Sequence, residues 1–116
     1  SLFPTLTELA GLPEKAGNDG PSIVPLLESP MAKWPHLSVT HLNEPGSYGL
    51  SGDRWRLIHY ANGDEELYDT VSDRYEWTNL AGQSKHAAQL LKLRQLGPQS
   101  FAPKFKAGSP GDFRAR

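Results

Sequence analysis

The sequence contains no cysteine in its 116 residues. This absence excludes disulfides, thiolate metal ligands and a cysteine nucleophile, and it fits oxidising and reducing compartments equally well. No apolar run approaches the ~20 residues that a transmembrane helix needs, so we expect no membrane span. Net charge is also nearly absent, at −1. The chain therefore has no overall electrostatic attraction to nucleic acid.

What remains is the composition of one globular domain. Apolar residues make up 37% and charged residues 22% of the chain, which is ordinary for such a domain. A chain of this length buries enough surface for one modest core. The sequence begins at Ser1, without an initiator Met, and enters a helical pattern at once. We therefore expect it to have been cut from a longer protein.

Two segments carry apolar residues at helical spacing. The first runs from Leu2 to Ala10, and Gly11 is suited to end it. A helix this short is unstable alone, so its apolar face needs a surface to pack against. The second runs from Gln83 to Leu96 and stops at Gly97-Pro98. Between them, residues 23–27 form a short apolar stretch that we expect to make one helical turn.

The middle of the chain predicts strands. The segments are Leu37 to Asn43, Tyr48 to Leu50, Trp55 to Tyr60 and Glu65 to Asp69. Asn62-Gly63 is typical of a tight hairpin turn, and the short connections imply an antiparallel meander. The predicted fold class is α+β: a small antiparallel sheet of three to four strands packed against a C-terminal helix, with an additional N-terminal helix. Residues 1–96 form the folded part, and residues 97–116 form an irregular tail rich in Pro, Gly and basic residues.

The histidines and carboxylates are the first candidates for a metal or catalytic site. The histidines are His36, His41, His59 and His86, and none has the paired spacing of a metal motif. His41 and His59 are expected to approach each other across the sheet, but two ligands do not make a site. The acidic residues of interest are Asp64, Glu65, Glu66, Asp69 and Asp73. A hard cation needs more oxygen ligands around a constrained turn, so we expect Asp69 and Asp73 to brace a turn instead.

The sequence contains no nucleophile elbow and no phosphate-binding glycine loop. Nothing brings together a nucleophile, a base and an oxyanion site. We therefore predict no catalytic residue, no metal ligand and no cofactor in this chain, and no enzymatic activity of the chain alone.

The aromatic residues leave two interpretations open. They are Trp34, Trp55, Trp77, Tyr48 and Tyr60. In a small sheet such residues usually belong to the core. The alternative is an autonomous carbohydrate-binding module in which a tryptophan stacks on sugars.

Three stretches carry a resemblance to a known family. They are residues 1–13 (SLFPTLTELAGLP), residues 19–27 (DGPSIVPLL), and the series RWRLIHY (54–60), EELYD (65–69) and EWTNL (76–80). In this order and spacing they resemble the C-terminal subdomain of sulfatases, in the alkaline-phosphatase superfamily. The similarity is greatest to the iduronate-2-sulfatase-like branch. Arg74 stands where the family usually has Pro, which affects only a turn.

The resemblance implies a parent protein that hydrolyses sulfate esters. Its formylglycine nucleophile and its calcium ion are expected in an N-terminal catalytic domain, which this chain lacks. The implied role of the chain is structural support for that domain, with the sulfated carbohydrate as the parent's substrate. We expect the isolated chain to self-associate through its exposed apolar helix face. The family suggests a periplasmic, secreted or lysosomal location. A related phosphodiesterase or phosphonate hydrolase remains an alternative parent.

The resemblance also implies one substrate-binding residue. In the family, the segment before the long strand lies towards the mouth of the active-site pocket, and here it is residues 47–51. Tyr48 matches an aromatic or His position of that segment. Ser51, however, replaces the usual Arg. Tyr48 is therefore predicted as a contact at the pocket rim, with a simple packing role as the alternative.

Overall fold

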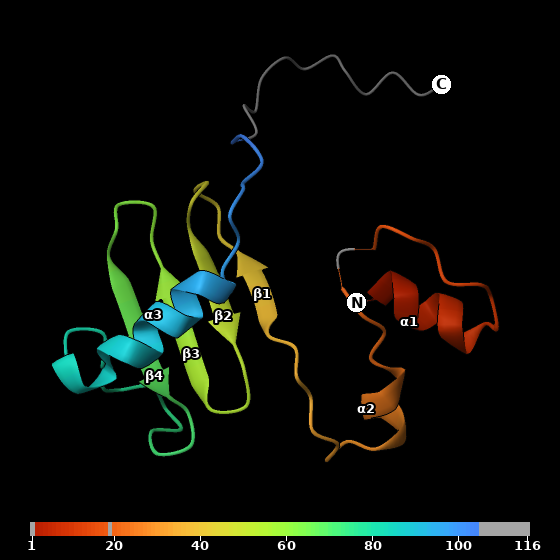
Figure 1. The fold of residues 1–116 in the computed structure, drawn as a ribbon, viewed down its shortest axis with the longest axis horizontal. Coiled ribbons are helices and arrows are strands. Elements are labelled where there is room, and N and C mark those ends of the chain that lie inside the picture. Colours follow the sequence, from red (N-terminus) through yellow and green to blue (C-terminus); the bar gives the residue numbers. More distant parts are fainter. Residues whose placement is uncertain (1, 19, 105–116) are drawn as a thin grey trace. The chain divides into compact units, whose positions relative to one another are not determined.

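The structure is a computed structural model that describes residues 2–18 and 20–104. The chain divides after Pro35 into two compact units. Figure 1 shows the ribbon, with the first unit in red to orange and the second in yellow to blue. Within the described residues, no helix is long and apolar enough to cross a membrane.

The first unit contains two short helices, α1 (Leu2–Leu9) and α2 (Val24–Glu28). Gly11 follows α1 with φ 66°, a left-handed conformation that favours glycine and ends the helix. The side chain of Thr5 is buried, and its Oγ1 accepts a hydrogen bond of 3.0 Å from the backbone N–H of Ile23. This bond joins α1 to the start of α2. The predicted N-terminal helix is confirmed.

The second unit contains a four-stranded antiparallel sheet in the order β1-β2-β3-β4. The strands are β1 (Ser38–His41), β2 (Tyr48–Ser51), β3 (Trp55–His59) and β4 (Glu65–Asp69). The turn between β3 and β4 contains Gly63 at φ 91°, as the Asn-Gly pair predicts. The predicted α+β fold with an antiparallel meander is therefore confirmed.

The core lies between one face of this sheet and helix α3 (Ala87–Leu96). The register places Leu57 opposite both Leu50 and Leu67, and all three leucines have 0% exposure. Leu90 and Leu93 of α3 cover them, and Figure 1 shows α3 lying across the sheet.

Helix α3 begins later than the sequence predicts. Residues Ser84–His86 form a 3-10 turn, η1, and the α-helix starts at Ala87. Gln83 has an extended backbone and offers no side-chain cap. Tighter turns of this kind are common at uncapped helix starts.

The loop after β4 covers the outer edge of that strand. The side-chain oxygen of Asn79 accepts hydrogen bonds from the N–H of Leu67 (3.0 Å) and of Ala81 (2.9 Å). Its amide nitrogen donates to the carbonyl of Glu65 (3.2 Å). The loop thus occupies backbone groups that an edge strand would otherwise expose. At the other edge, all four residues of β1 are exposed.

The predicted irregular tail begins at Gly97, and its residues 105–116 lie outside the described residues. The proposed boundary between residues 1–96 and 97–116 stays a prediction.

Candidate functional site

A row of four polar or aromatic side chains crosses the sheet near the β1–β2 turn. The register pairs His41 with Tyr48, Tyr48 with His59, and His59 with Glu65. The rings of Tyr48 and His59 stack at 5.1 Å, and Nδ1 of His59 lies 3.0 Å from Oε1 of Glu65. Directly opposed residues share one face of a sheet, so the row continues the face that carries the leucine core.

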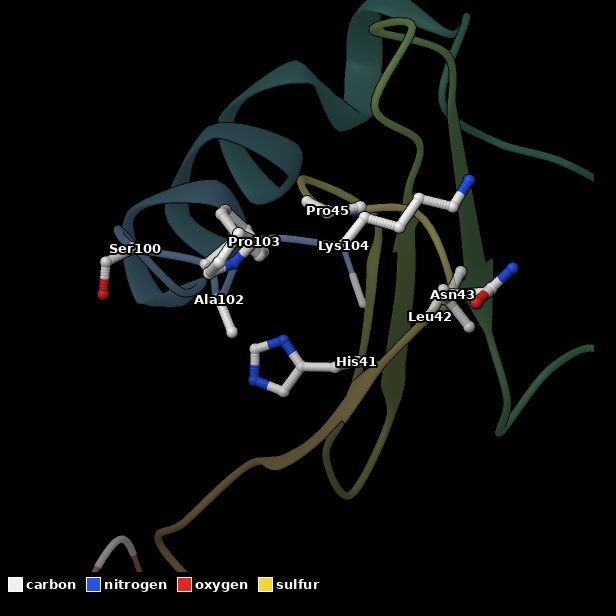
Figure 2. A pocket seen from close by; sticks show the side chains of 9 residues that line it. His41, Leu42, Asn43, Pro45, Ser100, Ala102, Pro103 and Lys104 are labelled. Carbon is white, nitrogen blue, oxygen red and sulfur yellow. The ribbon is translucent and has the colours of Figure 1, made fainter. Parts of the chain in front are cut away.

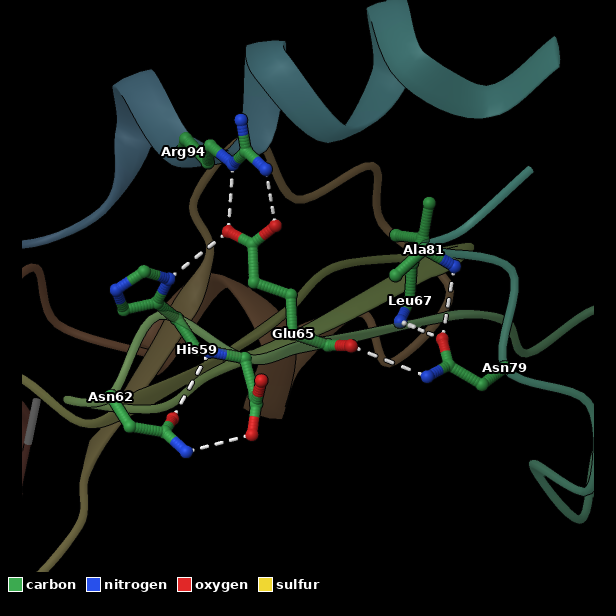
Figure 3. Close-up of polar contacts among 8 residues, drawn as sticks. His59, Asn62, Glu65, Leu67, Asn79, Ala81 and Arg94 are labelled. Carbon is green, nitrogen blue, oxygen red and sulfur yellow. Dashed lines mark hydrogen bonds and ion pairs between the residues drawn. The ribbon is translucent and has the colours of Figure 1, made fainter. Parts of the chain in front are cut away.

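Arg94 of α3 completes this row from above. Its Nε donates to Oε1 of Glu65 at 2.7 Å, and its Nη2 pairs with Oε2 of the same carboxylate. Figure 3 shows the guanidinium reaching down from the helix onto Glu65, with His59 at its side. The bond from Arg94 is the main cause that lowers the pKa of Glu65; burial opposes the shift and His59 adds to it. We call this ion pair between Arg94 of α3 and Glu65 of β4 the latch, because it connects the helix to the sheet.

Tyr48, the predicted substrate contact, is almost fully buried at 5% exposure. Its ring stacks between His59 and Phe101, with 6.0 Å between the Tyr48 and Phe101 centroids. It also fits closely against the end of α3: a Cβ added at Gly97 would lie 2.5 Å from the Tyr48 hydroxyl oxygen. Burial is the main cause that raises the pKa of Tyr48. This placement favours the packing role, and the contact with substrate stays a prediction.

A pocket of about 460 Å³ opens beside this row. It is lined by His41, Leu42, Asn43, Pro45 and residues 100–104, as Figure 2 shows. The rings of His41 and Phe101 meet edge to face at 5.9 Å, and Lys104 pairs with Glu44 at 2.5 Å. An imidazole and an amide beside apolar walls suit a polar group on a partly apolar ligand, because the Lys104 ammonium is already paired with Glu44. Tyr48 does not line the pocket itself, but it neighbours two residues that do, His41 on β1 and Phe101.

The structure does not bring the histidines together as a metal site. Strand β2 separates His41 from His59, and Tyr48 stands between them. The expected approach of these two imidazoles across the sheet is therefore wrong. Within the described residues, no three His, Cys, Asp or Glu side chains converge as a metal site would require.

Asp69 and Asp73 brace turns, as expected. Oδ1 of Asp69 accepts hydrogen bonds from the N–H groups of Val71 (3.3 Å) and Ser72 (3.4 Å). Asp69 also accepts two bonds from Arg54, at 3.0 and 2.6 Å, and this pairing is the main cause that holds its pKa well below the usual range. Asp73 accepts a 2.8 Å bond from the N–H of Thr78. Glu66 accepts bonds from the hydroxyls of two tyrosines on the face opposite α3, and the bond to Tyr68 raises the pKa of that phenol to about 12.

The candidate aromatics of the second unit, Trp55, Trp77, Tyr48 and Tyr60, do not form one platform. Trp55 packs against the core and contacts His86 edge to face at 5.6 Å. Tyr60 bonds to Glu66 on the other face of the sheet. Trp77 projects from the loop after β4 and stacks on Tyr75, a residue that sequence reasoning missed. The sequence did contain a signal for this pair, because Tyr75 and Trp77 flank Glu76 shortly after the predicted strand Glu65 to Asp69.

No protein-family model matches the sequence. Individual known proteins do match it, and the most informative of them are sulfatases. A sulfatase of Formosa agariphila is 32% identical over 88% of this chain. A Δ4,5-hexuronate-2-O-sulfatase of Bacteroides thetaiotaomicron is 35% identical over 82% of it. These matches cover only 20% and 21% of the relatives, so the chain spans about a fifth of their length.

The solved structures agree. The structure of a 2-O GAG sulfatase superimposes with a TM-score of 0.68 at 33% identity, covering 83% of this chain and 22% of that one. A phosphonate monoester hydrolase of Agrobacterium radiobacter, 24% identical with a TM-score of 0.59, shares the fold. The chain belongs to the sulfatases of the alkaline-phosphatase superfamily. It is a subdomain of such a protein, and the coverage of about a fifth agrees with the predicted C-terminal subdomain.

Proposed function

We propose that the chain is the C-terminal supporting subdomain of a sulfatase that removes sulfate from a carbohydrate. The similarity over 88% of the chain to only 20% of a sulfatase carries this proposal. The sequence similarity to a hexuronate-2-O-sulfatase (35% identical) and to a 2-O GAG sulfatase (33% identical) supports a 2-O-sulfated sugar as the substrate. The nucleophile, a formylglycine, and the calcium ion belong in this proposal to the remaining part of the protein.

The exposed face of α1 supports a docking role. Leu2, Phe3, Leu6 and Leu9 of α1, and Leu12 just after it, are each more than half exposed. A contiguous apolar surface of this kind marks an interface, and the remaining four-fifths of a sulfatase is the occupant that the lengths of the relatives suggest. The chain would thus stabilise the catalytic part by covering its surface.

The test measures sulfate release by the whole parent protein from a 2-O-sulfated unsaturated hexuronate disaccharide. We expect turnover, and we expect Leu6→Glu within the parent to lower the yield of folded enzyme because a charge would be buried in the interface. Hydrolysis of phosphonate monoesters without sulfate release would instead support the alternative hydrolase. The fold similarity alone does not separate these two activities.

Tyr48 can be tested in the same assay. A direct contact with substrate predicts that Tyr48→Phe raises KM for the sugar and leaves stability almost unchanged. A packing role predicts an unchanged KM, because the ring still fills the space between His59 and Phe101.

A further inference from the structure

Two large aromatic side chains are exposed together in the loop that follows β4. Trp77 is 84% exposed and Tyr75 is 70% exposed, and their rings stack at 5.4 Å with an interplanar angle of 24°. Single exposed apolar residues are common on protein surfaces. A stacked Tyr–Trp pair presented to solvent is an apolar patch, and such patches mark interaction sites.

The backbone beneath this pair is held in an uncommon conformation. Glu76, which lies between the two aromatics, has φ 57°, a left-handed conformation that is strained for a non-glycine residue. Its carboxylate pairs with Arg56 of β3 at 2.7 Å, and its N–H donates to the carbonyl of Asp73 at 3.1 Å. The side chain of Asp73 accepts the N–H of Thr78 at 2.8 Å. These contacts on both sides of Trp77 fix the loop.

The loop therefore presents a preorganised aromatic surface rather than a flexible one. Glu76 turns towards the sheet to reach Arg56, while its two aromatic neighbours remain exposed. Tyr75 covers part of Trp77, and the large exposure of Trp77 leaves most of the indole accessible. Rigid aromatic side chains bind at a low entropic cost.

An exposed cation immediately precedes this surface in the chain. Arg74 comes directly before Tyr75 and is exposed, and it makes no ion pair within residues 2–18 and 20–104. A guanidinium group binds oxyanions in a two-pronged geometry. An open indole face, with an exposed arginine one residue before Tyr75, matches a ring that has one apolar C–H face and carries an anionic group at its rim.

We propose that Tyr75 and Trp77 form an accessory carbohydrate-binding surface, on which a sugar ring of a sulfated polysaccharide stacks while Arg74 binds a sulfate or carboxylate group. The ligand class rests on the proposed function. The surface holds the polymer to the enzyme and takes no part in hydrolysis.

The proposal is tested by calorimetric titration of the 116-residue chain. The ligands are a heparin hexasaccharide, a chondroitin sulfate hexasaccharide and their desulfated forms. We expect Trp77→Ala to weaken binding about tenfold or more, because the stacking partner is lost. Trp77→Phe should retain part of the affinity, and Arg74→Gln should weaken only the sulfated ligands. Val71→Ala is the matched control, since Val71 is exposed in the same loop and is not aromatic.

Absence of binding by the unaltered chain, or equal affinities of the chain and its Trp77→Ala variant, would overturn the proposal. In the whole parent, the difference in acrylamide quenching between the unaltered protein and its Trp77→Phe variant reports how accessible Trp77 is, and an indole shielded by the rest of the protein would also overturn the proposal. Turnover of a sulfated disaccharide by the parent should be unaffected by Trp77→Ala, with only the KM for the polymer raised. If the parent released no sulfate, the proposed function would be contradicted. The calorimetric result would still decide whether Tyr75 and Trp77 bind a sugar.

Discussion

At the scale of single residues, Asn79 is exposed, yet its side chain stabilises the edge of β4. Its amide makes three hydrogen bonds to backbone groups, two of them on β4. We expect Asn79→Ala to lower the free energy of unfolding by about 1–3 kcal/mol, because the N–H of Leu67 and the carbonyl of Glu65 lose their partner. Urea unfolding followed by circular dichroism measures the change.

The exposed Asn43 provides the matched control, since it lies in a loop and none of these backbone groups depends on it. We expect Asn43→Ala to change stability by less than about 0.5 kcal/mol. Equal effects of the two substitutions would show that the loop after β4 does not protect the strand edge.

The sequence predicts apolar positions far better than polar partners. Period-2 alternation places Leu57 on the same face as Trp55, and the structure buries it. By contrast, the pairing of Glu65 with Arg94 depends on how α3 lies across the sheet. The pairing of Arg56 with Glu76 depends on a left-handed residue, a conformation that residue preferences do not indicate. Ion pairs that form only when distant segments pack together leave no periodic pattern in the local sequence.

At the scale of elements, the latch between α3 and β4 makes stability depend on pH. The pKa of Glu65 is lower in the folded chain than in the unfolded chain, chiefly because Arg94 donates to its carboxylate. The stabilisation is therefore fully present above the unfolded-state pKa and is lost as the pH falls through the folded-state pKa. Asp69, whose pKa is lowered in the same direction chiefly by Arg54, adds to this loss in acid.

We expect Arg94→Ala to reduce the free energy of unfolding by about 0.5–1.5 kcal/mol at pH 7, a modest effect because the guanidinium is half exposed and screened. The variant should also lose less stability than the unaltered chain between pH 5 and strongly acidic conditions. Urea midpoints measured at steps of pH check this. Lys92→Ala, which removes a cation from an exposed position of the same helix, should leave the pH dependence unchanged. An identical acid profile for Arg94→Ala would contradict the latch.

The elements themselves follow closely from the sequence, because short strands with alternating faces and an Asn-Gly turn are local signals. The start of α3 does not follow from the sequence, because Gln83 provides no side-chain cap and a 3-10 turn precedes the helix. The site residues are predicted less well. Tyr48 lies in the predicted second strand, yet its burial depends on Phe101 and on the close approach of Gly97. Both lie far along the chain.

At the scale of the whole molecule, the similarity to a fifth of a sulfatase and the exposed face of α1 lead to one expectation. The face of α1 that we propose to dock on the rest of the parent would remain uncovered in the isolated chain. Burying each exposed leucine would gain up to about 1.5–3 kcal/mol, so copies of the chain should associate. Sedimentation velocity should show a concentration-dependent shift towards a dimer or larger species, and the chain should bind a dye specific for apolar surfaces.

The double variant Leu6→Glu and Leu9→Glu should abolish this association, because two carboxylates on the apolar face of α1 would have to be desolvated in any dimer. Met31→Glu is the control, since Met31 is exposed at a position outside the helices and strands. It should sediment like the unaltered chain. A monomeric unaltered chain without dye binding would contradict self-association through α1, and it would count against α1 as the docking surface in the parent sulfatase.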